Sequence, residues 1–393
     1  MTINKFQGPP RDSRRRTLLT ALGAGLVTAA LPGCTPSSST RGAIPSYPRP
    51  YSRKPWAAPR VSMGAVIRTV VGLRPYRPAG FVVRSEKLDG KTLVHNYGHG
   101  GGGISLGWGS SALAVRELRG QQPGDAAVIG SGIMGLTSAR LLQDAGWRVT
   151  IYTRDMWRHT TSNVAAGEWD PYSVYDSSVA DSDFLAQFLW ASRIAHHAYT
   201  NLTGPKYGIR WLESYSLSET PRPSDAQPGP LDDLFAYRRE LGPGEHPFPT
   251  DYARHSVTMQ IDPGVLLRQL TEDFQLAGGQ FVITTFANPG EVLALKEPAV
   301  INCTGLGSRD LFGDTQLTSA KGQLVFLPPD PAVDYMTFGG GRGNLYMFPR
   351  SDVLLLGGTF KPGDFSKHPE MDETERIVTE HQRLFEKLAS VLG

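Results

Sequence analysis

The chain has 393 residues, of which 40% are hydrophobic and 20% are charged. This composition excludes a disordered protein, a collagen and a coiled coil, and the length suffices for one large domain or two ordinary ones. The formal net charge of +3 is too small an excess of basic residues to indicate nucleic-acid binding. Two cysteines, Cys34 and Cys303, exclude a disulfide framework and a metal site built from several cysteines.

Residues 1–33 are typical of an export signal. Arginines at 14–16 precede an uncharged run at 18–31 that is too short to span a bilayer comfortably. The S-R-R-x-x-L context resembles a twin-arginine signal, and the ending L-P-G-C at Cys34 resembles a bacterial lipobox. We therefore expect the twin-arginine translocase as a partner, a lipid anchor on Cys34, and a periplasmic location or one on the outer face of the cytoplasmic membrane. The alternative is an ordinary N-terminal helix with a basic start.

Residues 34–60 are rich first in serine and then in proline, which predicts an extended tether between the membrane and a folded domain. Beyond Cys34 the chain has only Cys303, so a mature protein could form no disulfide except between these two. Such a chain suits folding in a reducing cytoplasm before export.

The segment 126–153 has the pattern of a dinucleotide-binding unit. A short apolar strand ends in G-x-G-x-x-G at 130–135, and a helical and then a strand pattern follow. The glycines let the backbone approach a pyrophosphate, and the helix N-terminus offers free N–H groups to it. Asp155, with Arg154 beside it, is the candidate for binding ribose hydroxyls. The motif alone does not separate FAD from NAD.

Two segments before this unit carry a specific resemblance. Residues 68–78 (R-T-V-V-G-L-R-P-Y-R-P) and 95–109 (H-N-Y-G-H-G-G-G-G-I-S-L-G-W-G) resemble the G-F-R-P-x-R-P and H-N-Y-G-H-G-G-x-G segments of the D-amino-acid oxidase family. Residues 160–167 (T-T-S-N-V-A-A-G) resemble that family's flavin-phosphate loop. N-C-T-G at 302–305, K-G-Q at 321–323 and L-G-G-T at 356–359 are similar to further landmarks.

The resemblance covers essentially residues 61–393. It implies FAD as the cofactor and an α/β fold, in which an FAD-binding Rossmann-like parallel sheet is interleaved with a mixed-sheet substrate domain. In the family, however, the R-P-x-R-P and H-N-Y-G-H-G-G segments close the chain, whereas here they precede the glycine motif. We interpret this order as a circular permutation, which is tolerated where chain ends are exposed and close together.

Under this interpretation residues 61–118 complete the site, 119–125 form a surface linker, and 126–393 form the FAD-binding and substrate-binding domain. A mis-assembled gene or a domain-swapped dimer would also account for the order.

The resemblance implies three catalytic candidates. Arg74 matches the family's carboxylate clamp, a role that suits the bidentate geometry of a planar guanidinium. Gly101 matches a glycine whose carbonyl accepts from the substrate amine. Tyr346 aligns with a tyrosine whose hydroxyl touches the substrate carboxylate. The place of a second family tyrosine, on an active-site lid, is taken by the glycine-rich residues 339–343.

The candidates for binding FAD lie in the glycine motif, after the second strand, in the two loops and at the start of the helix that follows the H-N-Y-G-H-G-G segment. The N-terminus of that helix would face the flavin pyrimidine carbonyl. These candidates are Gly130, Gly132, Ile133, Met134, Gly135, Arg154, Asp155, Thr160, Thr161, Ala166, Gly167, Thr304, Gly305, Gly100, Gly101, Gly102, Gly103, Ile104 and Ser105.

The implied reaction transfers hydride from the Cα of an amino acid, with a D preference inherited from the family, to flavin N5. The imino acid then hydrolyses to a 2-oxo acid and ammonia, and oxygen reoxidises the flavin to give hydrogen peroxide. Alternatives are a dehydrogenase that feeds a membrane acceptor, an oxidase of secondary amines, and an FAD-free ligand-binding lipoprotein. Glu168 and Asp170 would favour a cationic substrate side chain, whereas Arg342 and Arg350 would favour an anionic one. No H-E-x-x-H or paired-cysteine pattern predicts a metal site.

Overall fold

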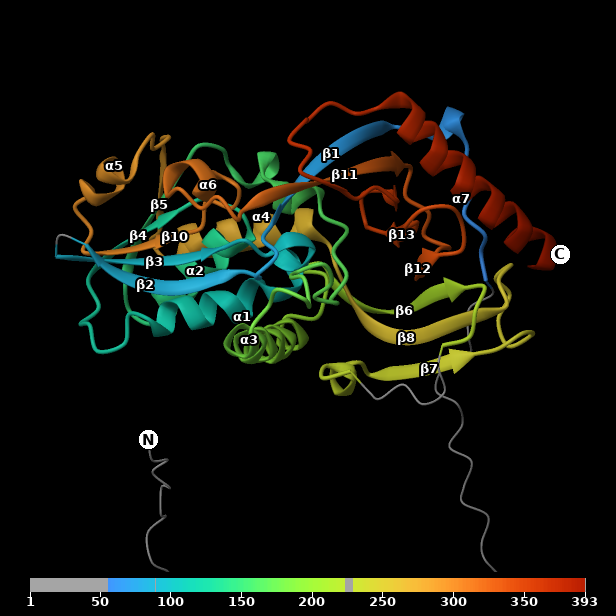
Figure 1. Cartoon of the computed structure of the whole chain (residues 1–393), viewed down its shortest axis with the longest axis horizontal. Coiled ribbons are helices and arrows are strands. Elements are labelled where there is room, and N and C mark those ends of the chain that lie inside the picture. The colour runs from blue at the N-terminus through green and yellow to red at the C-terminus, as the bar shows by residue number, and fades with distance from the viewer. Residues whose placement is uncertain (1–55, 89, 223–228, 393) are drawn as a thin grey trace, which may run out of the picture. The chain divides into compact units, whose positions relative to one another are not determined.

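The computed structural model describes residues 56–88, 90–222 and 229–392. Two sheets organise this part of the chain (Figure 1). The predicted signal at 1–33 and most of the tether lie outside the described residues. Within the described residues, no helix is both long and apolar enough to cross a membrane.

The smaller sheet has six strands in the order β2-β3-β10-β4-β5-β9. All neighbouring pairs are parallel except the antiparallel hairpin of β2 and β3. The central strands are continuous apolar runs, as expected for strands that are buried on both faces. Their bounds are β2 (Val82–Leu88), β3 (Lys91–Tyr97), β4 (Asp125–Ile129), β5 (Arg148–Thr153), β9 (Gln280–Ile283) and β10 (Ala299–Asn302).

Helices cover both faces of this sheet. Ala126 and Val128 face a core that includes side chains of α1 (Gly103–Arg116), α2 (Ile133–Asp144) and α4 (Pro263–Leu276). Ala127 and Ile129 point the other way, toward α5 (Pro289–Leu293) and α6 (Gly307–Leu311). The period of two in a strand sends alternate side chains to opposite faces, so β4 serves both cores. The long helix α3 (Ser182–Asn201) packs on α1.

The larger sheet has nine strands in the order β1-β11-β14-β13-β12-β6-β8-β7, with β15 also paired to β11. It is mixed, because β12 runs parallel to β6 while the other pairs are antiparallel. The two sheets together confirm the predicted α/β fold. The bounds are β1 (Arg68–Tyr76), β6 (Ile209–Ser218), β7 (Tyr237–Leu241), β8 (Tyr252–Ile261), β11 (Thr318–Leu327), β12 (Tyr335–Gly339), β13 (Tyr346–Pro349), β14 (Leu354–Gly357) and β15 (Lys361–Pro362).

Residues 68–116 contribute to both sheets instead of forming a separate module. Strand β1 pairs with β11 along its whole length, from Arg68 opposite Phe326 to Tyr76 opposite Thr318. Strand β3 pairs in parallel with β10, and β10 pairs on its other side with the glycine-motif strand β4. Helix α1 packs against α2 and α3. The segment therefore completes the fold within one chain.

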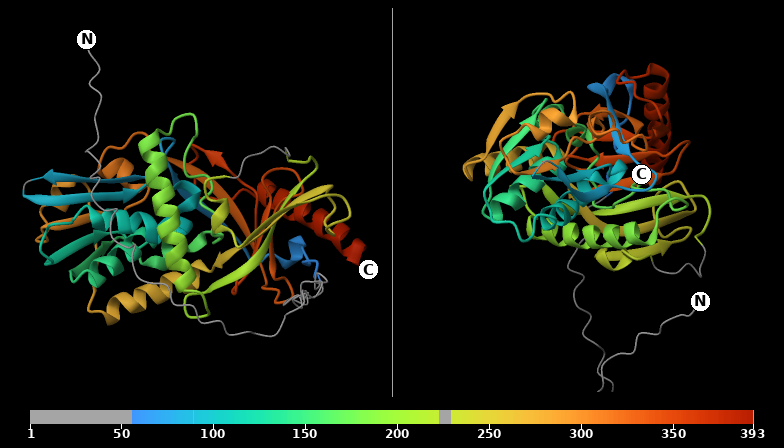
Figure 2. Two further views of the ribbon diagram at one scale, coloured as in Figure 1. Left: turned by 90° about the horizontal axis from the view of Figure 1, so that it is seen from below. Right: turned by 60° about the vertical axis from the view of Figure 1, so that its left-hand side comes forward.

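The first described residues lie beside the C-terminal helix. Val61 shares a core with Ile377, Phe385 and Leu388 of α7 (Met371–Leu392), and Trp56 packs against the same core. Figures 1 and 2 both show the blue residues around the short helix η1 (Met63–Ala65) next to the red α7. The turn from α1 to β4 is a largely exposed, polar stretch. This arrangement agrees with a circular permutation, which itself stays a prediction.

Candidate active site

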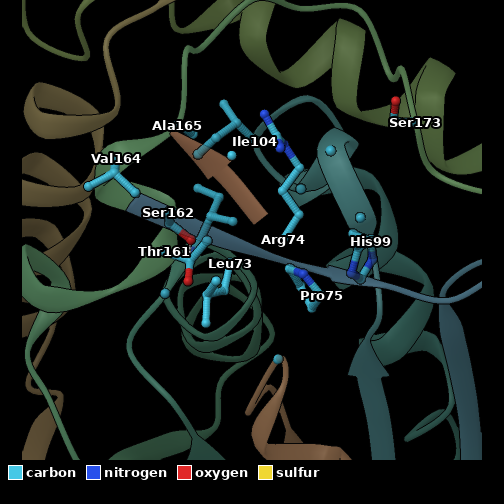
Figure 3. A pocket seen from close by; sticks show the side chains of 18 of the residues that line it. Leu73, Arg74, Pro75, His99, Ile104, Thr161, Ser162, Val164, Ala165 and Ser173 are labelled. Carbon is cyan, nitrogen blue, oxygen red and sulfur yellow. Dashed lines mark hydrogen bonds between the residues drawn. The ribbon is translucent and has the colours of Figure 1, made fainter. Parts of the chain in front are cut away.

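A cavity of about 1950 Å³ is lined by residues of both sheets. This volume exceeds the roughly 300–1,000 Å³ that is usual for a small-molecule pocket. Residues that follow the carboxyl ends of β4, β5 and β10 line one part of it, which is where open α/β sheets bind ligands. Figure 3 shows Arg74 reaching into this cavity from β1, with His99, Ile104 and the loop of Thr161 and Ser162 around it.

The glycine motif forms a tight turn against the neighbouring strand end. Gly130 has a φ of +108°, and a Cβ there would lie 2.5 Å from the Cys303 carbonyl oxygen. A Cβ on Gly135 would overlap the carbonyl of Gly130, so this glycine lets α2 start directly after the turn. The amide of Ile133 donates to Ser162 Oγ at 3.1 Å. The start of α2 is therefore tied to the loop that resembles the flavin-phosphate loop.

Asp155 follows β5 at the edge of the cavity. Its carbonyl accepts hydrogen bonds from Ser131 Oγ at 2.6 Å and from Thr153 Oγ1 at 2.7 Å, which fix its backbone beside the glycine motif. Its carboxylate pairs with the Nε of Arg154 at 2.7 Å. The Asp155 carboxylate and the Arg154 guanidinium thus lie together at the place where the sequence predicts binding of ribose hydroxyls.

A buried arginine supports the loop 160–167 from behind. Arg350 Nη1 donates to the carbonyls of Asn163 and Ala165, and its Nε and Nη2 pair with Asp352 at 3.0 Å each. Arg350 does not line the cavity. Gly167 closes the loop so tightly that a Cβ would overlap the carbonyl of Ile261.

The start of α1 reaches the cavity through a glycine run. Gly101 donates its amide to the Ser173 carbonyl at 2.9 Å, and Ser173 has a left-handed φ of 53°. The first residues of α1, Gly103, Ile104 and Ser105, line the cavity, and no side chain caps this helix. The positive end of the helix dipole therefore lies at the cavity wall. Burial lowers the pKa of His99 to about 3, and its Nε2 has no hydrogen-bond partner among the described residues.

Arg74 is held in place by groups that are distant in the sequence. Its Nη2 donates to the Tyr346 hydroxyl at 3.1 Å, and its Nη1 donates to the Thr359 carbonyl at 3.4 Å. The guanidinium lies against Gly322 of β11, where any Cβ would overlap it. The Phe360 ring lies near its other side, with the guanidinium carbon 5.9 Å from the ring centroid. These contacts leave the guanidinium on the cavity wall.

Nearly all candidate residues line this one cavity. They are Arg74, Gly100, Gly101, Gly103, Ile104, Ser105, Gly130, Gly132, Ile133, Met134, Arg154, Asp155, Thr160, Thr161, Ala166, Gly167, Thr304, Gly305 and Tyr346. The two exceptions are Gly102 and Gly135, which lie behind the wall: a Cβ on Gly102 would lie 2.5 Å from Val174 Cγ2, and one on Gly135 would overlap Gly130.

Comparison with known proteins bears directly on this site. The model of the FAD dependent oxidoreductase (DAO) family matches residues 125–393, more than half of the chain. The chain belongs to this family. It is 30% identical over 270 residues to a D-amino-acid oxidase of Streptomyces coelicolor, covering 67% of this chain and 78% of the relative. It is 29% identical over 265 residues to a D-amino acid oxidase of Dugesia ryukyuensis, covering 64% and 75%.

A solved structure of similar fold is glycine oxidase from Geobacillus kaustophilus, with a TM-score of 0.51 and 18% identity over 68% of this chain and 80% of that one. This likeness shows the fold, whereas membership of the family makes the protein an FAD-dependent oxidoreductase with FAD as its cofactor.

The residues present fit FAD. Gly130, Gly132 and Gly305 present backbone to the cavity where the pyrophosphate would lie, and Asp155 stands where its carboxylate would accept from ribose hydroxyls. The buried His99 Nε2, which lacks a partner, lies in the wall near the uncapped start of α1. No cluster of His, Cys, Asp or Glu within the described ranges could hold a metal ion.

The other part of the cavity in this oxidoreductase is lined by charged residues of both signs, which include Asp232, Arg222, Arg238 and Arg254. Glu168 and Asp170 line it, and Ser214 Oγ donates to Glu168 Oε1 at 2.9 Å. Burial, and then the neighbouring Asp170, raises the pKa of Glu168 to about 8. Burial likewise raises the pKa of Asp170, against the opposing influence of Arg238.

Arg342, in contrast, is exposed and lines a separate cleft with Glu380 and Arg383. Its backbone is tied to α7, because its amide donates to Glu380 Oε2 and its carbonyl accepts from Arg376.

Three site residues, Ser162, Ser173 and Gly322, were not predicted from the sequence. Ser162 accepts from the start of α2, Ser173 accepts from Gly101, and Gly322 makes room for Arg74. Gly322 lies inside the K-G-Q landmark, so a sequence signal for it existed. Ser173 carried no signal, because its role depends on a backbone contact to a residue 72 positions earlier.

Proposed function

We propose that this FAD-dependent oxidoreductase is an amino-acid oxidase that acts on D-amino acids. The observation that supports this most is the Arg74 guanidinium, presented at the wall of the cavity that also holds the glycine motif and bonded to the Tyr346 hydroxyl at 3.1 Å. A planar guanidinium beside a phenol suits a carboxylate ligand. The D preference follows the relatives, two of which are D-amino-acid oxidases.

In the proposed reaction Arg74 and Tyr346 bind the substrate carboxylate and orient the Cα–H bond. The carbonyl of Gly101 accepts from the substrate amine, which binds neutral. FAD, held by the glycine motif, Asp155 and the loop 160–167, would supply a two-electron acceptor for the hydride of Cα, and its reoxidation by oxygen would give hydrogen peroxide. The imino acid that leaves is hydrolysed to a 2-oxo acid and ammonia. The protein orients the substrate, which lowers the activation free energy by roughly several kcal/mol when the reacting atoms are well aligned.

The test starts from purified, flavin-loaded protein mixed anaerobically with a panel of D- and L-amino acids. We expect D-amino acids to bleach the oxidised flavin spectrum and the matching L-amino acids to leave it unchanged. Admitting oxygen should then restore the spectrum and produce one peroxide per 2-oxo acid. If no amino acid bleaches the flavin, the proposed function is wrong.

The same assay separates a dehydrogenase from an oxidase. In a dehydrogenase the amino acid would bleach the flavin, but the oxidised flavin spectrum would recover slowly in oxygen and rapidly with an added quinone or dye. N-methylated amino acids that outperform primary ones would indicate an oxidase of secondary amines.

We propose, in addition, that the protein acts outside the cytoplasm, exported folded by the twin-arginine route and tethered through a lipid on Cys34. This proposal is supported by the S-R-R-x-x-L and L-P-G-C patterns and by the Pro-rich stretch that follows them. A route that exports folded proteins suits an enzyme that must enclose FAD first.

A further inference from the structure

We propose that the substrate is a D-amino acid with a cationic side chain, an ammonium or guanidinium on a straight stem, and that Glu168 and Asp170 bind that cation. This inference rests on the proposed function and adds the substrate class to it.

The two carboxylates are placed by the backbone on the same side of a short extended segment. Trp169, between them, is fully buried and donates its amide to the Met259 carbonyl at 2.8 Å. Ser105 Oγ, at the start of α1, donates to the carbonyls of both Glu168 and Asp170, at 3.0 and 3.2 Å. Alternation along an extended chain turns residues 168 and 170 away from the side that buries Trp169. Both side chains consequently line the cavity.

The distance from Glu168 and Asp170 to the carboxylate ligands Arg74 and Tyr346 is one that a long substrate side chain would span. Glu168 accepts from Ser214 on β6, and Tyr346 lies on β13, two strands away in the same sheet. Two strand spacings amount to about 10 Å. Phe338 on β12, between these strands, lines the cavity and pairs in register with Tyr346. A methylene stem could lie on this ring while its charged end reaches the carboxylates.

The arginines that line this part of the cavity pair with other acids, and Arg222 Nε lies 3.8 Å from Glu240 Oε2. Arg238 pairs with Asp232 and stacks on the Phe235 ring, with its guanidinium carbon 3.8 Å from the centroid. Arg254 pairs with Glu240. Within the part of the chain that the structure describes, neither Glu168 nor Asp170 has an ion-pair partner within 4.0 Å. Burial and mutual repulsion both oppose the ionisation of two neighbouring carboxyl groups that have no ion-pair partner. A bound cation would offset the cost of burial and the repulsion.

The arginines that the sequence offered for an acidic substrate, Arg342 and Arg350, lie outside this cavity. The two arginines that could have bound a substrate carboxylate side chain do not reach this part of the cavity. Arg350 is buried behind the loop 160–167 and paired with Asp352, and Arg342 is exposed in a separate cleft. Of the four charged residues that the sequence left open, only Glu168 and Asp170 line the cavity.

The test compares D-lysine and D-arginine with D-norleucine, a neutral side chain of similar length, and with D-glutamate. The wild-type protein should give at least a roughly 10-fold higher kcat/KM with D-lysine than with D-norleucine, the effect of one charge-assisted hydrogen bond. D-glutamate should be the poorest of the four. This comparison needs no variant, so it cannot fail through misfolding.

Variants then assign the preference to residues. Glu168→Gln and Asp170→Asn should each lower kcat/KM for D-lysine by 10-fold or more, chiefly through KM, and leave D-norleucine within about threefold. The matched control is Asp183→Asn, which removes an exposed acid at the start of α3. Flavin content and the thermal midpoint report whether each variant is folded.

The outcomes are distinguishable. If the wild-type protein oxidises D-norleucine or D-glutamate with a kcat/KM equal to that for D-lysine, this inference is overturned and the proposed function stands. An equal loss for charged and neutral substrates in Glu168→Gln also overturns it, because it would mark Glu168 as a proton acceptor or a structural residue. If no amino acid reduces the flavin, the proposed function fails, and this inference fails with it.

Discussion

The guanidinium of Arg74 donates to the hydroxyl of Tyr346 at 3.1 Å, although 272 positions separate the two residues in the sequence. Each lies over a glycine of a neighbouring strand: Arg74 over Gly322 of β11 and the Tyr346 ring over Gly357 of β14. The larger sheet therefore brings the two proposed carboxylate ligands together, and the two glycines leave the space in which they meet.

Replacing Arg74 should impair catalysis without loss of flavin. A hydrogen bond to a charged group contributes about 1.5–3 kcal/mol, so Arg74→Ala should lower kcat/KM by roughly 10- to 100-fold or more. Arg74→Lys restores the charge without the planar fork and should stay impaired. Steady-state kinetics and the flavin spectrum measure both effects. An amine substrate without a carboxylate is the control: if Arg74→Ala slows its turnover as strongly, Arg74 does not act as the clamp.

Gly322→Ala should reproduce much of the Arg74 defect. The added methyl would overlap the guanidinium, so Arg74 must leave its position on the cavity wall. We expect a rise in KM and a lower kcat/KM while flavin content stays near that of the unaltered protein. Gly124→Ala, which has nothing within 4 Å of the new methyl, serves as the matched control. Unchanged kinetics in Gly322→Ala would mean that the position of Arg74 is not critical.

A chain rejoined in the order of the family should fold. In this protein residues 393 and 56 are joined by a Gly/Ser linker, and the chain opens between Gly120 and Gly124. Because Val61 and Leu388 share one core, the linker crosses the surface over a short distance, and loop closure costs little more as the linker lengthens. We expect flavin-loaded protein with a thermal midpoint within a few degrees of the original. Insoluble protein with every linker length tried would contradict the permutation.

The stability of the flavin-loaded protein should fall as the pH rises toward 8. Burial and Asp170 raise the pKa of Glu168 to about 8, above its ordinary 4.5, whereas Arg238 and Ser214 act against this rise. A raised pKa stabilises the folded state below the unfolded pKa, and that contribution is lost as the pH rises through the folded pKa. Thermal midpoints between pH 5 and 9 should decline less steeply in Glu168→Gln.

Asp170 titrates in the same cluster, beside Arg238, Asp232 and Arg254, so Asp170→Asn should shift this decline to a lower pH. A profile that is identical in Glu168→Gln would show that another group is responsible.

Export should depend on the paired arginines. Replacing Arg14 and Arg15 with lysine should retain flavin-loaded protein in the cytoplasm, because the twin-arginine receptor reads the guanidinium pair. Cys34→Ser should release the mature protein from the membrane or leave the signal uncleaved. Fractionation of cells that express each variant gives the answer. Unchanged export after the lysine substitutions would exclude this route.

Features that depend on neighbouring residues in the chain could be predicted from the amino-acid order. The strand, glycine turn and helix around Gly130 could be predicted, because a turn with positive φ and an uncapped helix start are local requirements. The T-T-S-N-V-A-A-G and H-N-Y-G-H-G-G segments indicated the family and the cofactor, and nearly every candidate residue that was named from the sequence lines the cavity. The displaced order of these segments was visible too, since it is a property of the chain.

Only the fold shows which of the four charged side chains line the cavity. From the sequence, Glu168 and Asp170 on one side and Arg342 and Arg350 on the other were equal candidates. In the fold, Arg350 pairs with Asp352 behind the loop and Arg342 lies in another cleft, while the two acids line the cavity. The contacts of Ser173 with Gly101 and of Gly322 with Arg74 were equally hidden. Such contacts depend on strand register and packing between segments far apart in the chain, which no local pattern encodes.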